Sequence, residues 1–124
     1  MPYTIEWEPR GVYKRFSGVC SWAEFLRSQE AVLGDARLDD IHYSINDLQG
    51  VENISIISIT GDEAEYSAAI TRGSSLSNPR LKIAFVTTDR RITMLAMAVR
   101  ALTPLRVATF ATEAEARSWC EIGD

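Results

Sequence analysis

Side chains that could perform acid–base, nucleophilic or metal chemistry are few and scattered in this sequence. His42 is the only histidine, and the two cysteines, Cys20 and Cys120, lie near opposite ends of the chain. No Gly-x-Ser-x-Gly motif accompanies them, and no Cys-x-x-Cys or other zinc-ligand spacing occurs. The glycine-rich signatures of nucleotide-binding loops are also missing. We therefore predict no catalytic residue, no metal site and no cofactor, and a protein that is not an enzyme.

Neighbouring acids are the remaining candidates for proton transfer. Asp39-Asp40 and Asp62-Glu63 are such pairs. Acids near helix starts have a simpler role, because they complement the positive end of the helix dipole. The net charge of −4 and a pI near 5.0 argue against nucleic acid as a partner, since nucleic-acid binding requires a basic surface.

A predicted helix from Asp89 to Leu102 carries the first of two candidate interaction surfaces. Its core stripe, at helical spacing, consists of Ile92, Leu95, Ala96, Val99 and Leu102. The opposite side should be polar, yet it carries apolar side chains edged by arginines, and methionine is an adaptable residue favoured at contact surfaces. The candidate surface comprises Arg90, Met94, Met97, Arg100 and Ala101.

Several occupants fit this surface. It would serve as a homodimer face, as the lid of an apolar ligand site, or as a membrane-surface contact assisted by the arginines. The alternative is that neighbouring elements cover both sides of the helix. The residue types do not decide between these possibilities.

The second candidate surface is a predicted loop after the third strand. Ligand and partner sites in open α/β sheets gather at the carboxyl ends of strands, where this loop is expected. Its candidate docking residues are Asp47, Gln49, Glu52, Ser55, Ile56 and Ser58. Asp47 would bind the loop's own amides or a partner's cation, or would only cap the turn. The alternative for the whole segment is a plain connection with its isoleucines in the core.

The elements that must position these residues follow from periodicity and capping signals. Alternating residues predict strands at 3–7 and 12–19, and the apolar segments 41–47, 81–87 and 105–110 predict three more. The segment 81–87 is the most apolar and is predicted to be central. Capping boxes at Ser21-x-x-Glu24 and Thr112-x-x-Glu115 start two helices. Two further helices are predicted at 59–72 and 89–102, and the tract 73–79 ends the first of them.

The order β-β-α-β-α-β-α-β-α predicts one α/β domain over residues 1–124. An N-terminal hairpin followed by alternating helices and strands implies a mixed, mostly parallel sheet with about four helices packed on it. The first residues lack the features of a signal peptide, and no apolar run is long enough to span a bilayer. We therefore expect a cytoplasmic protein with reduced cysteines.

Three segments give the chain a family resemblance. The run from Gly11-Val12-Tyr13 to Phe16-Ser17-Gly18-Val19, the segment Asp47-Leu48-Gln49-Gly50-Val51, and Ser77-Asn78-Pro79-Arg80-Leu81-Lys82 together resemble the SpoIIAA-like proteins. These are small bacterial proteins with the STAS fold of anti-sigma-factor antagonists. The resemblance implies a central mixed sheet with helices, in agreement with the element order.

The resemblance also implies a regulatory role, with one departure. Antagonists of that class bind a partner protein and are switched by phosphorylation of a serine in an Asp-Ser-Ser-Gly stretch. Aligned without gaps, that stretch falls on Ser55-Ile56-Ile57-Ser58, and the phosphoserine position is Ile56. Ile56 has no hydroxyl, so the usual switch residue is missing.

Two functional hypotheses follow. The first is a non-enzymatic binding or regulatory module that acts through protein–protein contacts as a homodimer, without a phosphorylation switch at the usual serine position. The second is a carrier or sensor of a small apolar or lipid-like ligand with membrane-surface association.

Overall fold

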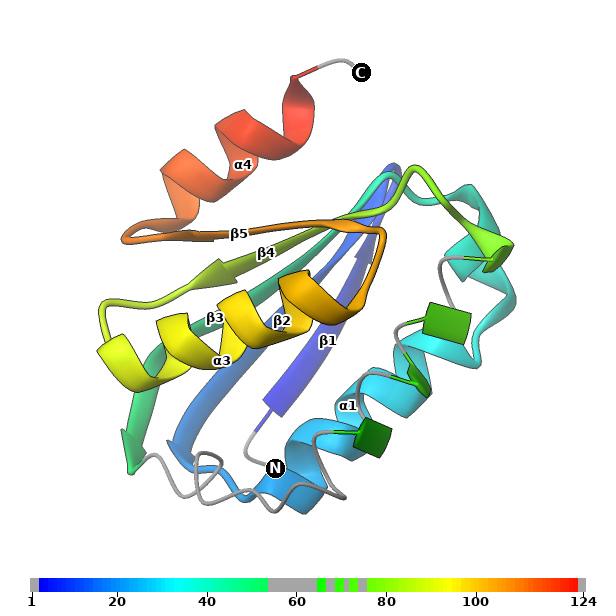
Figure 1. The fold of residues 1–124 in the computed structure, drawn as a ribbon. Coiled ribbons are helices and arrows are strands. Elements are labelled where there is room, and N and C mark those ends of the chain that lie inside the picture. Colours follow the sequence, from blue (N-terminus) through cyan, green and yellow to red (C-terminus); the bar gives the residue numbers. More distant parts are fainter. Residues whose placement is uncertain (1–2, 54–64, 67–68, 71, 74–75, 123–124) are drawn as a thin grey trace.

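The computed structural model describes residues 3–53, 65–66, 69–70, 72–73 and 76–122. Its strands form one five-stranded sheet in the order β1-β2-β3-β4-β5, so neighbours in the sheet are also neighbours in the chain (Figure 1). β1 pairs antiparallel with β2, and every later pair is parallel. This confirms the predicted mixed sheet with an N-terminal hairpin. The strands are β1 (Tyr3–Glu8), β2 (Gly11–Val19), β3 (Tyr43–Asn53), β4 (Lys82–Val86) and β5 (Arg106–Phe110).

Helices cover both faces of the sheet. α1 and α3 lie on one face and α4 lies on the other (Figure 1). Their bounds are α1 (Trp22–Leu33), α3 (Arg90–Leu102) and α4 (Glu113–Glu121), with the short 3-10 turn η1 (Ala36–Asp40) after α1. Of the helix predicted at 59–72, the described residues 65–66, 69–70 and 72 are helical. Residues 73, 76 and 77 are also helical, although they belong to the tract predicted to end that helix.

The local capping signals form as the sequence predicts. The amide of Glu24 donates to the hydroxyl of Ser21, and the Glu24 carboxylate accepts from the Ser21 amide, which completes the capping box of α1. Gly34 follows the last turn of this helix. The amide of Glu115 donates to the Thr112 hydroxyl at the start of α4. These bonds involve residues three apart, so the sequence alone specifies them.

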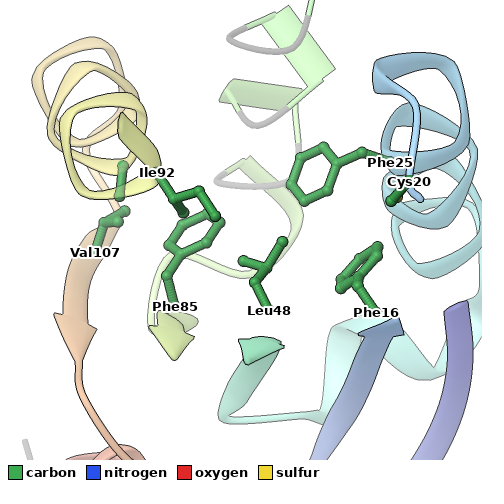
Figure 2. Packing of buried hydrophobic residues seen from close by; sticks show 8 residues of the cluster. Phe16, Cys20, Phe25, Leu48, Phe85, Ile92 and Val107 are labelled. Atoms are coloured by element: carbon green, nitrogen blue, oxygen red, sulfur yellow. The ribbon is translucent and has the colours of Figure 1, made fainter. Parts of the chain in front are cut away.

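Three groups of buried residues form the core. Two fill the space between the sheet and the α1/α3 layer, and the third lies beneath α4. Figure 2 shows how side chains from the strands, such as Phe16, Leu48 and Phe85, meet Phe25 of α1 and Ile92 of α3. The α4 side is held by Tyr13, Ile45, Ala84, Val86, Ala116 and Cys120.

The third strand is longer than predicted, and this corrects the expected docking loop. β3 begins at Tyr43 and continues to Asn53, so Asp47 lies inside a strand and not at its end. Beyond Asp47, β3 pairs only with β2, through a register shift between Arg15 and Ser17. A Cβ at Gly50 would lie 2.9 Å from the carbonyl oxygen of Phe16, so glycine permits the close approach of the two strands. The glycine and polar residues that suggested a loop belong to this strand extension.

Two smaller expectations also need correction. β4 is buried, as predicted, but it lies between β3 and β5, and the middle strand of the sheet is β3. Strand order follows chain order, which hydrophobicity does not encode. His42 precedes β3 and lies outside the strand in which it was predicted.

Candidate functional site

α3 is oriented by its amino-terminal cap and by two buried residues. The Asp89 carboxylate accepts the amide of Arg91 at 2.8 Å and so satisfies a donor of the first turn. Ile92 and Ala96, four residues apart, are each 2% exposed and pack against the sheet. This fixes which side of the helix faces solvent. The side chains of Leu95, Val99 and Leu102 are outside the described part of the structure.

The outward side of α3 carries large apolar side chains that are exposed to solvent. Met94 is 70% exposed and Met97 is 63% exposed. Arg90, Arg100 and Ala101 are also exposed, so all the residues predicted for this surface lie on the solvent side of the helix. Positions 90, 94, 97 and 101 follow one another at helical spacing and form a continuous stripe. We call Arg90, Met94, Met97, Arg100 and Ala101 the α3 surface.

The rim of the α3 surface is basic. No acidic residue occurs between positions 90 and 102. The nearest acid in the chain, Asp89, is engaged by the guanidinium of Arg91 at 3.3 Å. Arg90 and Arg100 therefore stand at the two ends of an apolar stripe with no carboxylate of α3 itself to neutralise them. Such a surface favours a contact whose centre is apolar and whose edge is acidic.

The second predicted surface is only partly accessible. Asp47 is buried; its carboxylate accepts a hydrogen bond from the hydroxyl of Tyr13 on β2 and another from the amide of Gln49 at 3.0 Å. Of the predicted alternatives, the bond to a nearby amide is therefore the one observed. Gln49 and Glu52 are exposed, and the Gln49 side chain donates to the carbonyl of Ala111 at 3.1 Å. Ser55, Ile56 and Ser58 lie outside the described residues.

A pocket joins the end of β3 to the start of α3. It has a volume of about 270 Å³ and lies where β4 has ended and β3 continues paired with β2. Leu48, Gln49 and Val51 line one side, and Thr87, Asp89 and Ile92 line the other. The structure thus brings part of the second predicted surface next to the helix that carries the first, at the carboxyl edge of the sheet.

A buried polar group that sequence analysis missed lies beneath α1. Lys14 of β2 is 3% exposed, and its ammonium nitrogen is 3.4 Å from the Ser28 hydroxyl and 5.6 Å from the Phe25 ring centre. Burial lowers the pKa of Lys14 from 10.5 to about 7. On the neighbouring strand, Asn46 is buried, and its Oδ1 accepts no hydrogen bond from any residue that the structure describes. The alternation of Val12, Lys14 and Phe16 within the predicted strand was the available signal for an inward lysine.

Polar side chains on the α4 side of the sheet form a network of ion pairs and hydrogen bonds. Arg117 of α4 bonds Glu8 of β1 at 2.8 Å and Glu113 at 2.7 Å, and the Glu8 carboxylate also accepts the hydroxyl of Tyr43. Burial and the bond to Glu8 raise the pKa of Tyr43 to about 12. The phenol therefore keeps its proton at neutral pH. This network anchors α4 to the hairpin.

Both thiols are buried and poorly suited to nucleophilic attack. Cys20 packs in the core under α1 and α3, while Cys120 packs under α4, so the sheet separates them. Burial raises the pKa of each thiol to about 11, which leaves little reactive thiolate at neutral pH. Among the described residues, no three His, Cys, Asp or Glu side chains gather as metal ligands. No helix of the described chain is both long and apolar enough to cross a bilayer.

Comparison with known proteins defines the fold class. No protein-family model matches the sequence, and no curated protein matches it. The structure is similar to the crystal structure of an uncharacterized protein of the DUF3478 family with a SpoIIAA-like fold, from Shewanella loihica PV-4. The TM-score is 0.58 at 11% identity, and the match covers 95% of this chain and 91% of that chain. The chain therefore has a SpoIIAA-like fold, as the short motifs predicted, and an identity this low shows the fold alone.

Proposed function

We propose that this protein is a non-enzymatic binding module that acts through protein–protein contacts made by the α3 surface. The observation that carries the proposal is the exposure of Met94 and Met97 on a helix whose other side is already packed on the sheet. Methionine pairs an apolar side chain with rotational freedom, which suits contact with a partner. Among the described residues, the side chains of the Arg117 network bond one another and both thiols stay protonated at neutral pH, so neither group offers a reactive centre.

The positive charge at the rim of the α3 surface favours a partner protein with an acidic surface. An apolar stripe flanked by Arg90 and Arg100 complements a protein surface with an apolar centre and acidic edges. In a symmetric pair with antiparallel α3 helices, Arg90 of one copy would approach Arg100 of the other, and in a parallel pair each arginine would approach its counterpart. Like charges would then meet at both ends of the contact, and this favours a different, acidic protein over the homodimer expected from the sequence. We place this contact in the cytoplasm, as the sequence suggested.

The proposal is tested by placing two carboxylates on the surface. Met94→Glu/Met97→Glu should leave the fold intact, because both side chains are exposed. The matched control is Ala114→Glu/Ser118→Glu, which adds the same charges to two exposed positions one turn apart on α4. Affinity capture from the native host with quantitative mass spectrometry should show a partner that the wild type and the α4 variant retain and that the α3 variant loses. Equal capture by all three proteins would contradict the proposal.

Light scattering on the same three proteins addresses self-association. A monomeric wild type supports a different protein as partner. If the wild type is a dimer and the α3 variant is not, the α3 surface is still the binding site, but its partner is a second copy of this chain and not an acidic protein. A dimer that persists in the α3 variant would assign self-association to another surface.

A second candidate function is carriage of a small apolar ligand with one polar head. The observation that favours it is a pair of buried polar groups between the sheet and α1, Lys14 and Asn46, whose hydrogen bonding is incomplete among the described residues. A ligand with a hydrogen-bonding head and an apolar body would satisfy both and remain shielded from water. Native mass spectrometry of the purified protein tests this. A co-purified molecule lost in Lys14→Met supports the carrier, whereas an unliganded mass in both proteins contradicts it.

A further inference from the structure

A second pocket, remote from α3, lies at the amino edge of the sheet. It has a volume of about 240 Å³ and is lined by basic side chains from separate segments of the chain. Arg10 comes from the turn between β1 and β2, His42 from the residue before β3, and Arg80 and Lys82 from the approach to β4 and its first residue. Glu121, at the end of α4, is the one acidic residue among those lining this pocket.

Backbone hydrogen bonds hold these segments side by side. The amide of His42 donates to the carbonyl of Arg10 at 2.6 Å, and the amide of Lys82 donates to the carbonyl of His42 at 3.0 Å. The three basic residues therefore follow one another across the sheet at fixed spacing. Their convergence comes from the order β1-β2-β3-β4, and it does not depend on the conformation of a long loop.

Lys82 neutralises the carboxyl end of α4 at this pocket. It is 4% exposed, and its ammonium group donates to the carbonyls of Trp119 at 3.0 Å and Ile122 at 2.6 Å. A helix carboxyl end carries a partial negative charge that would repel an anion. Lys82 offsets this charge and has one N–H donor left after these two bonds.

Arg10 and Arg80 are the cations available to a ligand. Arg80 donates one N–H to the carbonyl of Asp39 at 3.2 Å. The Arg10 side chain makes no hydrogen bond or ion pair in the described part of the structure. Both are exposed, so they can adjust to a small ligand. A guanidinium presents paired N–H donors that match the oxygens of an oxyanion.

We propose that this pocket binds a phosphate group. Two guanidiniums and an ammonium, less the carboxylate of Glu121, leave two formal positive charges, which suit a dianion better than a singly charged carboxylate. The volume is below the roughly 300–1,000 Å³ of pockets that hold drug-sized ligands, so the group is inorganic phosphate or the phosphate end of a small phosphomonoester. This site shares no residue with the α3 surface and does not depend on the function proposed for it.

His42 provides a direct reporter for the test. It is the only histidine of the chain, so its imidazole signals in an NMR spectrum are unambiguous. Inorganic phosphate is titrated at constant ionic strength against sodium chloride, with glycerol 3-phosphate and acetate as parallel probes. We expect saturable shifts of the His42 ring with phosphate, with a dissociation constant in the millimolar range or below, and no saturable shift with acetate. Saturation by glycerol 3-phosphate as well identifies a phosphomonoester site, and saturation by phosphate alone identifies a site for the free ion.

Variants of opposite charge sharpen the result. Arg10→Gln should weaken phosphate binding about tenfold, and Glu121→Gln should tighten it, because it removes the carboxylate that lines the pocket. Arg37→Gln is the matched control, since Arg37 is a surface arginine already paired with Asp35 at 2.8 Å. Met94→Glu/Met97→Glu should bind phosphate like the wild type, so a failure of this site is distinguishable from a failure of the α3 contact. The proposal is overturned if phosphate gives no saturable shift, if acetate saturates equally, or if Arg37→Gln weakens binding as much as Arg10→Gln.

Discussion

Lys14 and Asn46 are paired in the parallel register of β2 and β3. Both side chains are buried, and some of their hydrogen-bonding groups are unpaired among the described residues. Within the described residues, the ammonium of Lys14 has one hydrogen bond, to Ser28, and Oδ1 of Asn46 accepts none. Burial without full pairing is unfavourable, so this pair lowers the stability of the fold. The pair also places polar groups in the core beneath α1, where they could bind the polar head of a ligand.

Replacement of Lys14 by methionine should stabilise the protein near pH 7. The pKa of Lys14 is about 7 in the folded protein and about 10.5 in the unfolded chain, so between these values the unfolded state binds more protons. Wild-type stability therefore carries a penalty below pH 7 that disappears as the pH rises towards 10.5. Lys14→Met should remove it, with a gain of about 3–5 kcal/mol at pH 7 from a shift of this size.

The measurement for Lys14 is urea unfolding of both proteins from pH 6 to 10. The quantity to compare is the difference between the two free energies of unfolding, because burial raises the pKa of Tyr43 and of the two thiols and these groups also titrate in the alkaline range. That difference should shrink steadily above pH 7. A difference that stays constant with pH would show that Lys14 is charged in the folded protein.

Phe85→Ala should destabilise the protein by about 3–5 kcal/mol. Phe85 lies on β4, is 4% exposed, and packs with Ile92 and Val107 in the core between the sheet and α3 (Figure 2). Met94→Ala is the control, because that side chain is exposed and its loss should change stability by less than about 0.5 kcal/mol. Chemical denaturation with a common slope for all variants provides the comparison. A loss below about 1 kcal/mol for Phe85→Ala would place β4 outside the core.

Arg117→Gln should weaken the attachment of α4 most clearly at neutral pH. The hydrogen bonds from Arg117 lower the pKa of Glu8 and of Glu113 below 4.5. The two ion pairs therefore stabilise the fold above pH 4.5, and this stabilisation is lost as the pH falls through the pKa values of the two carboxyls in the folded protein. The pairs are partly exposed, so the expected loss is about 1 kcal/mol at pH 7 and less at pH 3. An equal loss at both pH values would assign the effect to packing.

The chain isolated from its native host should carry no stoichiometric phosphate at Ser55 or Ser58. In the ungapped comparison with the antagonists that the sequence resembles, Ile56 falls on the phosphoserine position, and it has no hydroxyl. Phosphate would add about −1.5 to −2 charges beside the isoleucines of this segment. Phosphosite mapping by mass spectrometry tests the expectation. Stoichiometric phosphate on either serine would restore a phosphorylation switch to this protein.

Local signals in the sequence predicted most of the fold. Alternation placed Tyr3, Ile5 and Trp7 on one side of β1, and the capping residues Ser21 and Thr112 located two helix starts, because these patterns depend on neighbouring residues. The exposure of Met94 and Met97 was also predictable, since helical spacing alone opposes them to Ile92 and Ala96.

Non-local pairing explains what the sequence did not reveal. The extension of β3 to Asn53 depends on pairing with β2 beyond a register shift, and no residue of the segment 48–53 signals that partner. Arg10, His42 and Lys82 meet only because three strands lie in chain order. Lys14 is different, because its alternation with Val12 and Phe16 was a local signal for the buried side of β2 that the prediction did not use.

The most direct measurement of the α3 contact is methionine oxidation in the native host. Oxidation of methionine to the sulfoxide follows solvent exposure, and Met94 and Met97 are open to solvent in the isolated chain. Oxidative footprinting compares the protein at its native abundance in host extract with the purified chain at the same concentration of oxidant. If a partner covers the α3 surface, both methionines oxidise more slowly in the extract, and Arg100→Glu restores the faster rate by reversing the charge at one end of the basic rim. Equal rates in extract and in buffer would contradict the α3 surface as a protein-binding site.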